Sequence, residues 1–336
     1  MEVNPNLSTK INVKTSKIRA LGRLEINEVT SSLDWKAKLL EVLESTSIDW
    51  KYLMSWWSAM QDEVASREEE DELGYYDFMA QLEVPYFHWG GMRATERLVS
   101  LCKITSGKEV LTVGCGTGYS ACYIAKKFGC RVVGIDISEE MIGKAKERAE
   151  TEGLTDRVEF YVGDAYDLPF DDNSFDVVMT EFVSIFLDKQ RAFREYVRVL
   201  RSGGYVGVNE LYKLEDIPQE AKELISEAEG GFEEAIGLAF VLPTPRDWEE
   251  WFRESDLEDI QLEEVDYTYS MGEYAEAVGG KAKLVKLFMK SIYHLLFNKR
   301  MRKKWMRVGK VKDVLMKNKK TKQYAGAILC VGRKRA

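Results

Sequence analysis

The chain has 336 residues, of which 45% are hydrophobic and 31% are charged, and with its net charge of −8 it has the composition of a soluble globular protein with a full core. It contains no run of about 18 uninterrupted apolar residues, and its beginning, MEVNPNLSTK, lacks the apolar part of a signal peptide, so we expect a cytoplasmic protein without a spanning helix. The 5 cysteines include no C-x-x-C pair and there are only 2 histidines, so we expect reduced thiols and no metal site.

The N-terminal part, residues 1–91, is interpreted as a helical cap. Residues 32–67 have the pattern of two helices rich in leucine and tryptophan. Trp56 and Trp57 would be core or pocket-wall residues. The charged run EEEDE follows these helices and is expected to be exposed to solvent.

An aromatic stretch, YYDFMAQLEVPYFHWGG, comes just before a helix predicted at 92–104. It ends in two glycines that could act as a hinge, so we interpret it as a candidate lid. Tyr76 and Tyr86 would then line a pocket, and His88 would supply a side chain of the type that titrates near neutral pH. Plain packing of the aromatic rings, and a hydrogen bond from His88 to a backbone carbonyl, are the alternatives.

Residues 108–211 alternate short β-rich runs with helical runs. This alternation is typical of βαβ units around a parallel sheet. Strands are predicted at 109–113, 131–136, 157–162, 175–180 and 203–210, and helices at 118–128, 138–152 and 188–200. Further along the chain, helices are predicted at 218–239 and 245–254, a strand at 257–267 and a final β-like run at 324–334.

A glycine loop follows the first strand of this core, in the stretch VLTVGCGTGYS. Its glycines are Gly114, Gly116 and Gly118, and Tyr119 stands where the G-x-G-x-x-G fingerprint of dinucleotide-binding proteins has its third glycine. The loop therefore disfavours NAD, although glycines still allow a ligand to approach the backbone closely. A tight turn without a ligand is the alternative.

Two acidic residues stand where later strands end. Asp136 ends the second strand in GIDIS, where a carboxylate can accept hydrogen bonds from both hydroxyls of a ribose. Asp164 follows the third strand in GDAYDLPF, where it could accept a hydrogen bond from an adenine amino group. Helix capping at the strand–helix junction is the alternative role for both residues.

With FDVVMTE and VLRSGGYVGVNE further along, these motifs resemble in order and spacing the class I methyltransferases that use S-adenosylmethionine, in their small-molecule, type 11-like branch. The match covers residues 107–211. It implies an α/β fold with a Rossmann-like seven-stranded sheet whose last strand is antiparallel, here formed by residues 92–267 and 323–336. One departure is Ser202, which stands where family members usually have proline, and it should alter only the stiffness of the turn.

The resemblance also implies how the cofactor, S-adenosyl-L-methionine, would be held. The glycine loop would lie against its methionine and sugar, Asp136 would hold the ribose, and Asp164 with Ala165 would flank the adenine. The full set of expected cofactor contacts is Gly114, Cys115, Gly116, Gly118, Asp136, Ile137, Asp164, Ala165 and Glu181.

The methyl acceptor is expected beyond the carboxyl ends of the strands, where open α/β sheets bind their ligands. Glu181, after the fourth strand, could orient the acceptor, take a proton or stabilise a cation, or it could be an exposed strand end. We expect Glu181, His88 and Tyr86 to be catalytic. Glu210, after the fifth strand, could play the same parts as Glu181, but we favour its interpretation as a solvent-exposed strand end. Since no [DN]-P-P-[YF] sequence follows the fourth strand, methylation of bases or amides is disfavoured.

The positive charge is concentrated late in the chain. Residues 281–322 hold 16 lysines and arginines and 1 acidic residue, whereas residues 1–280 hold 29 basic and 55 acidic residues. The run 281–305 has the pattern of an amphipathic helix. Its apolar stripe is Leu284, Phe288, Ile292 and Leu295, and its polar stripe is Lys283, Lys286, Lys290 and His294.

This basic segment could contact one of three partners. It could lie on an anionic membrane surface, making the protein peripheral there. It could instead be a helical insertion, 268–322, whose apolar stripe packs on the fold while its lysines face solvent or the acidic part of the chain. RNA is the third, and it is disfavoured because aromatic residues that could stack on bases are sparse.

The sequence thus predicts an enzyme that transfers a methyl group from S-adenosylmethionine to a small, apolar acceptor, such as a lipid-like or isoprenoid-like molecule. Alignment of the nucleophile should contribute most, on the order of 7–11 kcal/mol, against roughly 10²–10⁴-fold in rate for a general base. An RNA methyltransferase that uses the basic insertion, and a non-enzymatic cofactor-binding or membrane-scaffold protein, are the alternatives.

Overall fold

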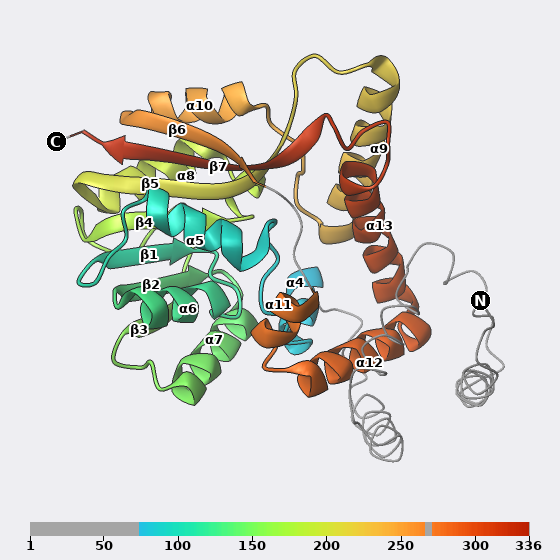
Figure 1. Ribbon diagram of the computed structural model, residues 1–336, viewed down its shortest axis with the longest axis horizontal. Coiled ribbons are helices and arrows are strands. Elements are labelled where there is room, and N and C mark those ends of the chain that lie inside the picture. Colours follow the sequence, from blue (N-terminus) through green and yellow to red (C-terminus); the bar gives the residue numbers. More distant parts are fainter. Residues whose placement is uncertain (1–73, 266–270, 336) are drawn as a thin grey trace, which may run out of the picture. The chain divides into compact units, whose positions relative to one another are not determined.

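The computed structural model describes residues 74–265 and 271–335. The two helices expected at 32–67, together with Trp56 and Trp57, lie outside the described residues. Figure 1 shows that the described part is built around one mixed sheet with helices on both of its faces.

The strands of this sheet follow the order β3-β2-β1-β4-β5-β7-β6. They are β1 (Glu109–Val113), β2 (Arg131–Asp136), β3 (Val158–Val162), β4 (Phe175–Glu181), β5 (Leu200–Lys213), β6 (Leu257–Val265) and β7 (Ala325–Lys334). β1 to β5 are parallel to their neighbours, whereas β7 runs antiparallel to β5 and β6. The predicted Rossmann-like sheet with an antiparallel last strand is confirmed, and the strand order reverses between β1 and β4.

Two helical layers bury their apolar sides against this sheet. One layer is α5 (Gly91–Leu101), α6 (Tyr119–Phe128) and α7 (Glu139–Glu152), and the other includes α8 (Lys189–Val199) and α10 (Pro245–Glu254). On α8, Phe193 and Tyr196 are fully buried, as their helical spacing predicted. The separate cores on the two faces leave the carboxyl edge of the parallel strands as the place for a ligand.

β5 is longer than the predicted strand 203–210. α8 ends at Val199, and Leu200 already has extended dihedral angles, so the helix passes directly into the strand. β5 then continues to Lys213 because Tyr205 to Lys213 pair with Arg333 to Ala325 of β7. The partner strand comes from the far end of the chain, so the local pattern could not set this length.

The basic segment forms two helices rather than one. α12 (Lys281–Phe297) ends before Asn298, and α13 (Lys299–Met316) begins directly after it. The side chain of Asn298 accepts a hydrogen bond from the N–H of Met301 at 2.8 Å, so it caps the start of α13. The prediction of a single amphipathic helix at 281–305 is therefore wrong, because Asn298 ends α12 and caps the start of α13.

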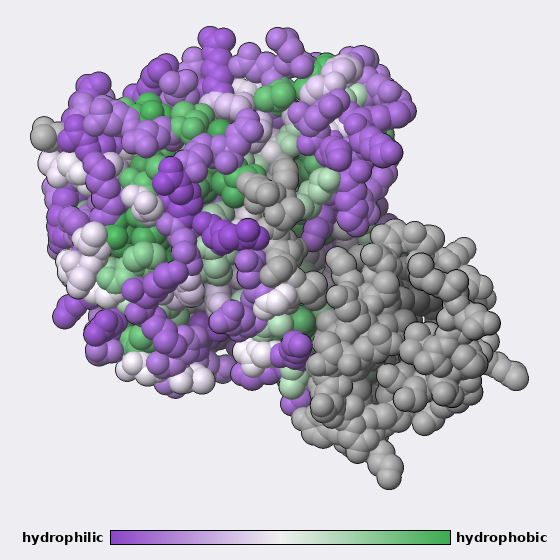
Figure 2. Space-filling view, viewed as in Figure 1, coloured by the Kyte–Doolittle hydropathy of each residue, from purple (hydrophilic) through white to green (hydrophobic). Residues whose placement is uncertain are grey.

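α13 packs along α9 (Gln219–Ile236), and their side chains are paired by charge. Lys310 and Arg307 each lie 2.6 Å from a glutamate of α9, Glu227 and Glu234 respectively. Figure 2 shows a largely hydrophilic surface over these two helices. Part of the positive charge of the segment thus faces the acidic part of the chain.

The lid stretch also rests on the basic helices. It begins with α4 (Tyr75–Gln81), whose Phe78 is buried in a cluster with Met301 of α13 and contacts Trp305 edge-on, with ring centroids 6.1 Å apart. From α12, Lys290 donates a hydrogen bond to the carbonyl of Gln81 at 2.9 Å. In the expected apolar stripe Leu284 is buried and Phe288 and Ile292 are partly buried, while the side chain of Leu295 lies outside the description.

Candidate functional site

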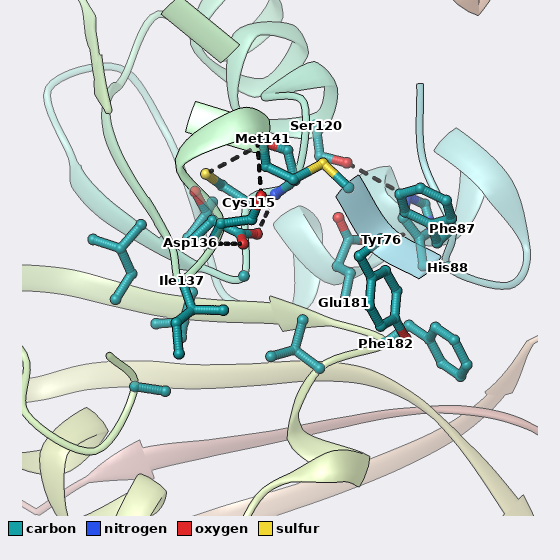
Figure 3. A pocket seen from close by; sticks show the side chains of 18 of the residues that line it. Tyr76, Phe87, His88, Cys115, Ser120, Asp136, Ile137, Met141, Glu181 and Phe182 are labelled. Atoms are coloured by element: carbon teal, nitrogen blue, oxygen red, sulfur yellow. Dashed lines mark hydrogen bonds and ion pairs between the residues drawn. The ribbon is translucent and has the colours of Figure 1, made fainter. Parts of the chain in front are cut away.

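A pocket of about 390 Å³ lies at the carboxyl edge of the parallel strands, beneath the lid stretch. Figure 3 shows Asp136 and Ile137 at one end of it and Tyr76, Phe87 and His88 at the other. The expected site residues that line it are Tyr86, His88, Gly114, Cys115, Gly116, Asp136, Ile137, Asp164, Ala165 and Glu181. The cavity thus brings together residues as far apart in the chain as Tyr86 and Glu181, which are 95 positions apart.

The loop after β1 forms the floor of the pocket. Gly114 and Gly116 have φ values of +68° and +54°, in the left-handed region that favours glycine. A Cβ on Gly114 would stand 2.3 Å from a methyl carbon of Val183, whereas a Cβ on Gly116 would have no atom within 4 Å. Gly114 is thus needed for close packing, and Gly116 leaves its backbone open to a ligand.

Gly118 is not among the residues that line the pocket. Its φ is +73°, and a Cβ there would stand 2.7 Å from Phe160 of β3 and 2.8 Å from Ala145 of α7. Only glycine lets the start of α6 come this close to the neighbouring strand and helix. Gly118 thus has a packing role in the structure, and its expected contact with the cofactor stays a prediction.

Asp136 ends β2 with both carboxylate oxygens held by backbone N–H groups. Oδ2 accepts from Gly116 at 2.9 Å and Oδ1 accepts from Ser138 at 3.0 Å. Burial raises the pKa of this carboxyl, and the backbone hydrogen bonds oppose that effect. Ser138 also caps α7 by accepting from Met141, and its hydroxyl donates to Asp77 of α4 at 2.6 Å. The lid is thus hydrogen-bonded to the residue that helps to orient Asp136.

Asp164 follows β3 on an exposed turn at the edge of the pocket. Its Oδ1 accepts the N–H of Tyr166 at 2.9 Å, and its backbone forms a bridge with Asp167. The carboxylate therefore orders a turn instead of capping a helix. Ala165, between these residues, is half-buried and also lines the pocket.

Glu181 ends β4 inside the pocket, with its side chain only 10% exposed. Its Oε1 accepts a hydrogen bond from the hydroxyl of Thr95 at 2.7 Å and lies 3.4 Å from the amide nitrogen of Asn209. Nδ1 of His88 is 3.7 Å from the same oxygen. The carboxylate is therefore held in one orientation by groups from α5, β5 and the lid.

His88 is buried, with 5% of its surface exposed, among polar groups. Its Nε2 lies 3.4 Å from the hydroxyls of both Thr95 and Ser120, and the ring of Tyr86 stacks on it with centroids 5.0 Å apart. The structure thus brings Glu181, His88 and Tyr86 together. Sequence reasoning missed Thr95, Ser120 and Asn209, although a polar Asn209 within the apolar run YVGVNE was a signal.

Glu210 is buried rather than exposed, with 1% of its surface accessible, so the interpretation of it as a solvent-exposed strand end is wrong. The segment that follows β4 folds over this part of β5 and covers it. Oε1 of Glu210 accepts hydrogen bonds from the N–H groups of Val183 and Ser184 in that segment, at 2.9 and 2.7 Å.

Aromatic rings form the wall of the pocket beyond Glu181. Phe182 and Phe186 lie edge-on with centroids 5.2 Å apart, and Tyr76 faces Phe186 at 6.4 Å. On its other side, Phe186 stacks on Phe232 of α9, with ring centroids 6.2 Å apart and an interplanar angle of 7°. The wall is therefore apolar and is backed by a ring of α9.

Comparison with known proteins places the chain among methyltransferases. A family model described as a methyltransferase domain matches residues 111–208. An uncharacterized protein of Haemophilus influenzae is 30% identical over 228 residues, which cover 66% of this chain and 88% of that protein.

Named relatives are matched over shorter segments. Methyltransferase GfsG of Streptomyces halstedii is 38% identical over 122 residues, covering 36% of this chain and 44% of that protein. Sterol 24-C-methyltransferase ERG6B of Gibberella zeae is 39% identical over 122 residues, covering 34% of this chain and 32% of that protein. The chain thus spans less than half the length of these two relatives.

Two solved structures share the fold. The [4+2]-cyclase SpnF superimposes with a TM-score of 0.55 at 24% identity, covering 73% of this chain and 80% of that chain. Haemonchus contortus phosphoethanolamine N-methyltransferase 2, in complex with phosphomonomethylethanolamine and S-adenosylhomocysteine, superimposes with a TM-score of 0.53 at 20% identity, covering 75% of this chain and 55% of that chain.

Proposed function

We propose that this chain, which belongs to the class I S-adenosylmethionine-dependent methyltransferases, transfers a methyl group to a small, apolar acceptor. The observation that carries the proposal is a single pocket with two different ends. One end is lined by backbone and Asp136, and the other by aromatic rings and Glu181.

The first end fits the cofactor. Gly116 leaves open the space that a Cβ would fill, so a ligand can approach the backbone there. Asp136 keeps lone pairs for ribose hydroxyls, because each of its oxygens accepts only one of the backbone hydrogen bonds described above. Asp164 and Ala165 also line the pocket, and we propose that they flank the adenine. When bound, S-adenosylmethionine supplies an electrophilic methyl group on a positively charged sulfur.

The second end can position a nucleophile and take its proton. Glu181 is in one fixed orientation, and a hydroxyl or amine that donates to it would be aligned by that hydrogen bond. His88 lies beside this carboxylate, with Nδ1 3.7 Å from Oε1, and Tyr86 fixes the ring plane of His88 by stacking. We propose these three residues as the catalytic group.

The aromatic wall favours an acceptor with an apolar body. Phe182 and Phe186 would contact that body, and Tyr76 and Phe87 would cover it from the lid. Among the relatives, a sterol methyltransferase is named for an acceptor of this apolar kind.

The test is incubation of the purified protein with radiolabelled S-adenosylmethionine and separated lipid, small-metabolite and RNA fractions. Label is expected in an apolar compound from the lipid or small-metabolite fraction, and E181Q is expected to remove it. Label that appears only in RNA, or in no fraction while the cofactor still binds, contradicts the proposal.

We also propose that the exposed lysines of α12 contact an anionic membrane surface. Among the described residues no helix is both long and apolar enough to cross a bilayer, so any contact would be peripheral. Lys281 and Lys283 are exposed on the first turn of α12. Each lysine near an anionic surface contributes about 1 kcal/mol. The double variant K281Q/K283Q is therefore expected to weaken binding to phosphatidylserine vesicles by roughly 30-fold at low salt, as measured by co-sedimentation.

The matched control is K310Q/K320Q. These lysines already pair with Glu227 and Glu220 of α9, so their loss should change vesicle binding much less. Wild-type binding should also weaken as salt rises, because exposed charges are screened beyond about 8 Å at physiological ionic strength. Wild-type protein that ignores anionic vesicles at low salt would show that the helix serves packing alone.

A further inference from the structure

Glu210 lies directly beneath the segment that joins β4 to α8. This segment contains Phe182, Val183 and the 3-10 turn η2 (Ser184–Phe186). Oε1 of Glu210 accepts hydrogen bonds from the N–H groups of Val183 and Ser184, near the start of the segment. Oε2 has no hydrogen-bond partner among the described residues. One buried carboxyl oxygen thus satisfies two backbone donors of the segment.

Lys189 holds the other end of the same segment. Its Nζ donates to the carbonyl oxygens of Ile185 and Leu187, at 3.0 and 2.7 Å. The hydroxyls of Thr180 and Ser184 lie 2.8 Å apart and add a third tie from β4. Backbone donors at the start and acceptors at the end are therefore both satisfied by side chains.

This segment supplies wall residues to both ends of the pocket. Phe182, Val183, Phe186 and Leu187 all line it. Val183 fills the space beside Gly114 so closely that a Cβ on Gly114 would stand 2.3 Å from it. Phe182 has a φ of +60°, a conformation that a bulky residue holds only when its surroundings fix it. A shift of the segment would therefore move the aromatic wall and disturb the glycine loop.

We propose that Glu210 is a positioning residue that holds the segment 182–187 against the pocket, and that loss of its proton loosens this segment. The positioning role of Glu210 concerns only the pocket wall and the glycine loop. The link to catalysis rests on the proposed function, in which this wall contacts the acceptor.

The direction of the pH effect follows from burial. Desolvation raises the pKa of Glu210 to about 8 from its usual 4.5, opposed by the backbone hydrogen bonds and by Lys189. The titratable groups that face it are Lys189 and Tyr196 on α8 and Tyr76 on α4. Burial raises the pKa of both tyrosines, so they remain neutral as Glu210 titrates.

The closed segment thus binds the Glu210 proton more tightly than an opened segment, in which the carboxyl meets water. The closed state is fully favoured below pH 4.5, and its advantage is lost as pH rises toward about 8, where the closed form also loses the proton. Opening should become up to about tenfold easier per pH unit in this range and level off above it.

The experiment compares amide hydrogen exchange of peptides spanning 182–187 in wild type, E210A and E210Q, together with calorimetric titration of S-adenosylhomocysteine. E210A removes two hydrogen bonds, so exchange in this segment should be about tenfold faster and S-adenosylhomocysteine should bind several-fold more weakly. E210Q keeps the accepting oxygen and should restore both readouts near neutral pH. After correction for intrinsic exchange, wild-type protection should fall at least about fivefold between pH 6.5 and pH 8.5, whereas that of E210Q should not.

The matched control is D176A. Asp176 also accepts a backbone N–H, that of Glu109 at 2.9 Å, but at the amino edge of the sheet, so exchange in 182–187 should stay at the wild-type rate. Wild-type exchange and affinity in E210A, or one pH profile for wild type and E210Q, would overturn the proposal. If E210A does not fold, the profiles of wild type and E210Q decide alone. Neither readout uses an acceptor, so an error in the acceptor assignment leaves this test intact.

Discussion

Replacing Asp136 with alanine is expected to weaken the binding of S-adenosylhomocysteine by about 1.5–3 kcal/mol, or roughly 10- to 150-fold in the dissociation constant. The carboxylate is the proposed acceptor for the ribose hydroxyls, and hydrogen bonds to a charged group lie in this range. It also orders the glycine loop through the N–H of Gly116, so the loop should become less preorganised. Isothermal titration calorimetry measures the change.

Two further variants separate the causes. D136N keeps the size of the side chain but has only one accepting oxygen, so it cannot satisfy Gly116 and Ser138 as the carboxylate does and should lose most of the same affinity. E139Q removes a negative charge from an exposed residue of the first turn of α7 and should bind nearly as the wild type does. Wild-type affinity in a folded D136A protein would remove Asp136 from the cofactor site.

The β/α core could be predicted because each element carries its own local signal. Ser138 before two glutamates predicted the start of α7, and its hydroxyl does accept the N–H of Met141. The period of Phe193 and Tyr196 predicted the buried face of α8. The carboxyl ends of parallel strands share one edge of the sheet, so the residues expected after β1, β2 and β4 had to come close together.

What could not be predicted depends on contacts between distant parts of the chain. The hydrogen bond between Thr95 and Glu181 joins residues 86 positions apart, and no local pattern marks Thr95 as its donor. Glu210 looked like a strand end open to water because the segment that covers it comes from another strand, 26 positions away. The motif predicted a ligand contact for Gly118, but it could not show that Phe160 and Ala145 also require a glycine there for packing.

The basic segment illustrates the same limit for charge. Its composition predicted an unusual neighbour but could not choose between a membrane and the acidic part of the chain. In α13, Lys310 pairs with Glu227, 83 positions away in the acidic part of the chain. The exposed lysines of α12 remain available for the other neighbour.

E181Q is expected to lower turnover by roughly 10²–10⁴-fold, the range for loss of a positioned general base, while changing S-adenosylhomocysteine affinity little. Glutamine has nearly the same shape, and its oxygen can still accept from Thr95, so the pocket should stay intact. It cannot take a proton from the acceptor. The measurement is the initial rate with radiolabelled cofactor and the fraction that wild-type protein labels.

T95V distinguishes proton transfer from alignment at this carboxylate. Valine keeps the volume of Thr95 but removes the hydroxyl that donates to Glu181 at 2.7 Å, so the carboxylate remains a base with a less fixed orientation. Turnover should fall by roughly tenfold, the worth of one hydrogen bond, and by clearly less than in E181Q. If T95V lowers turnover as much as E181Q does, orientation is the main role of Glu181.

If E181Q turns over at the wild-type rate, Glu181 is only a satisfied strand end and the catalytic assignment fails. A parallel loss of S-adenosylhomocysteine affinity in E181Q would instead assign the carboxylate to the cofactor end, because a group that acts only on the acceptor leaves cofactor binding unchanged.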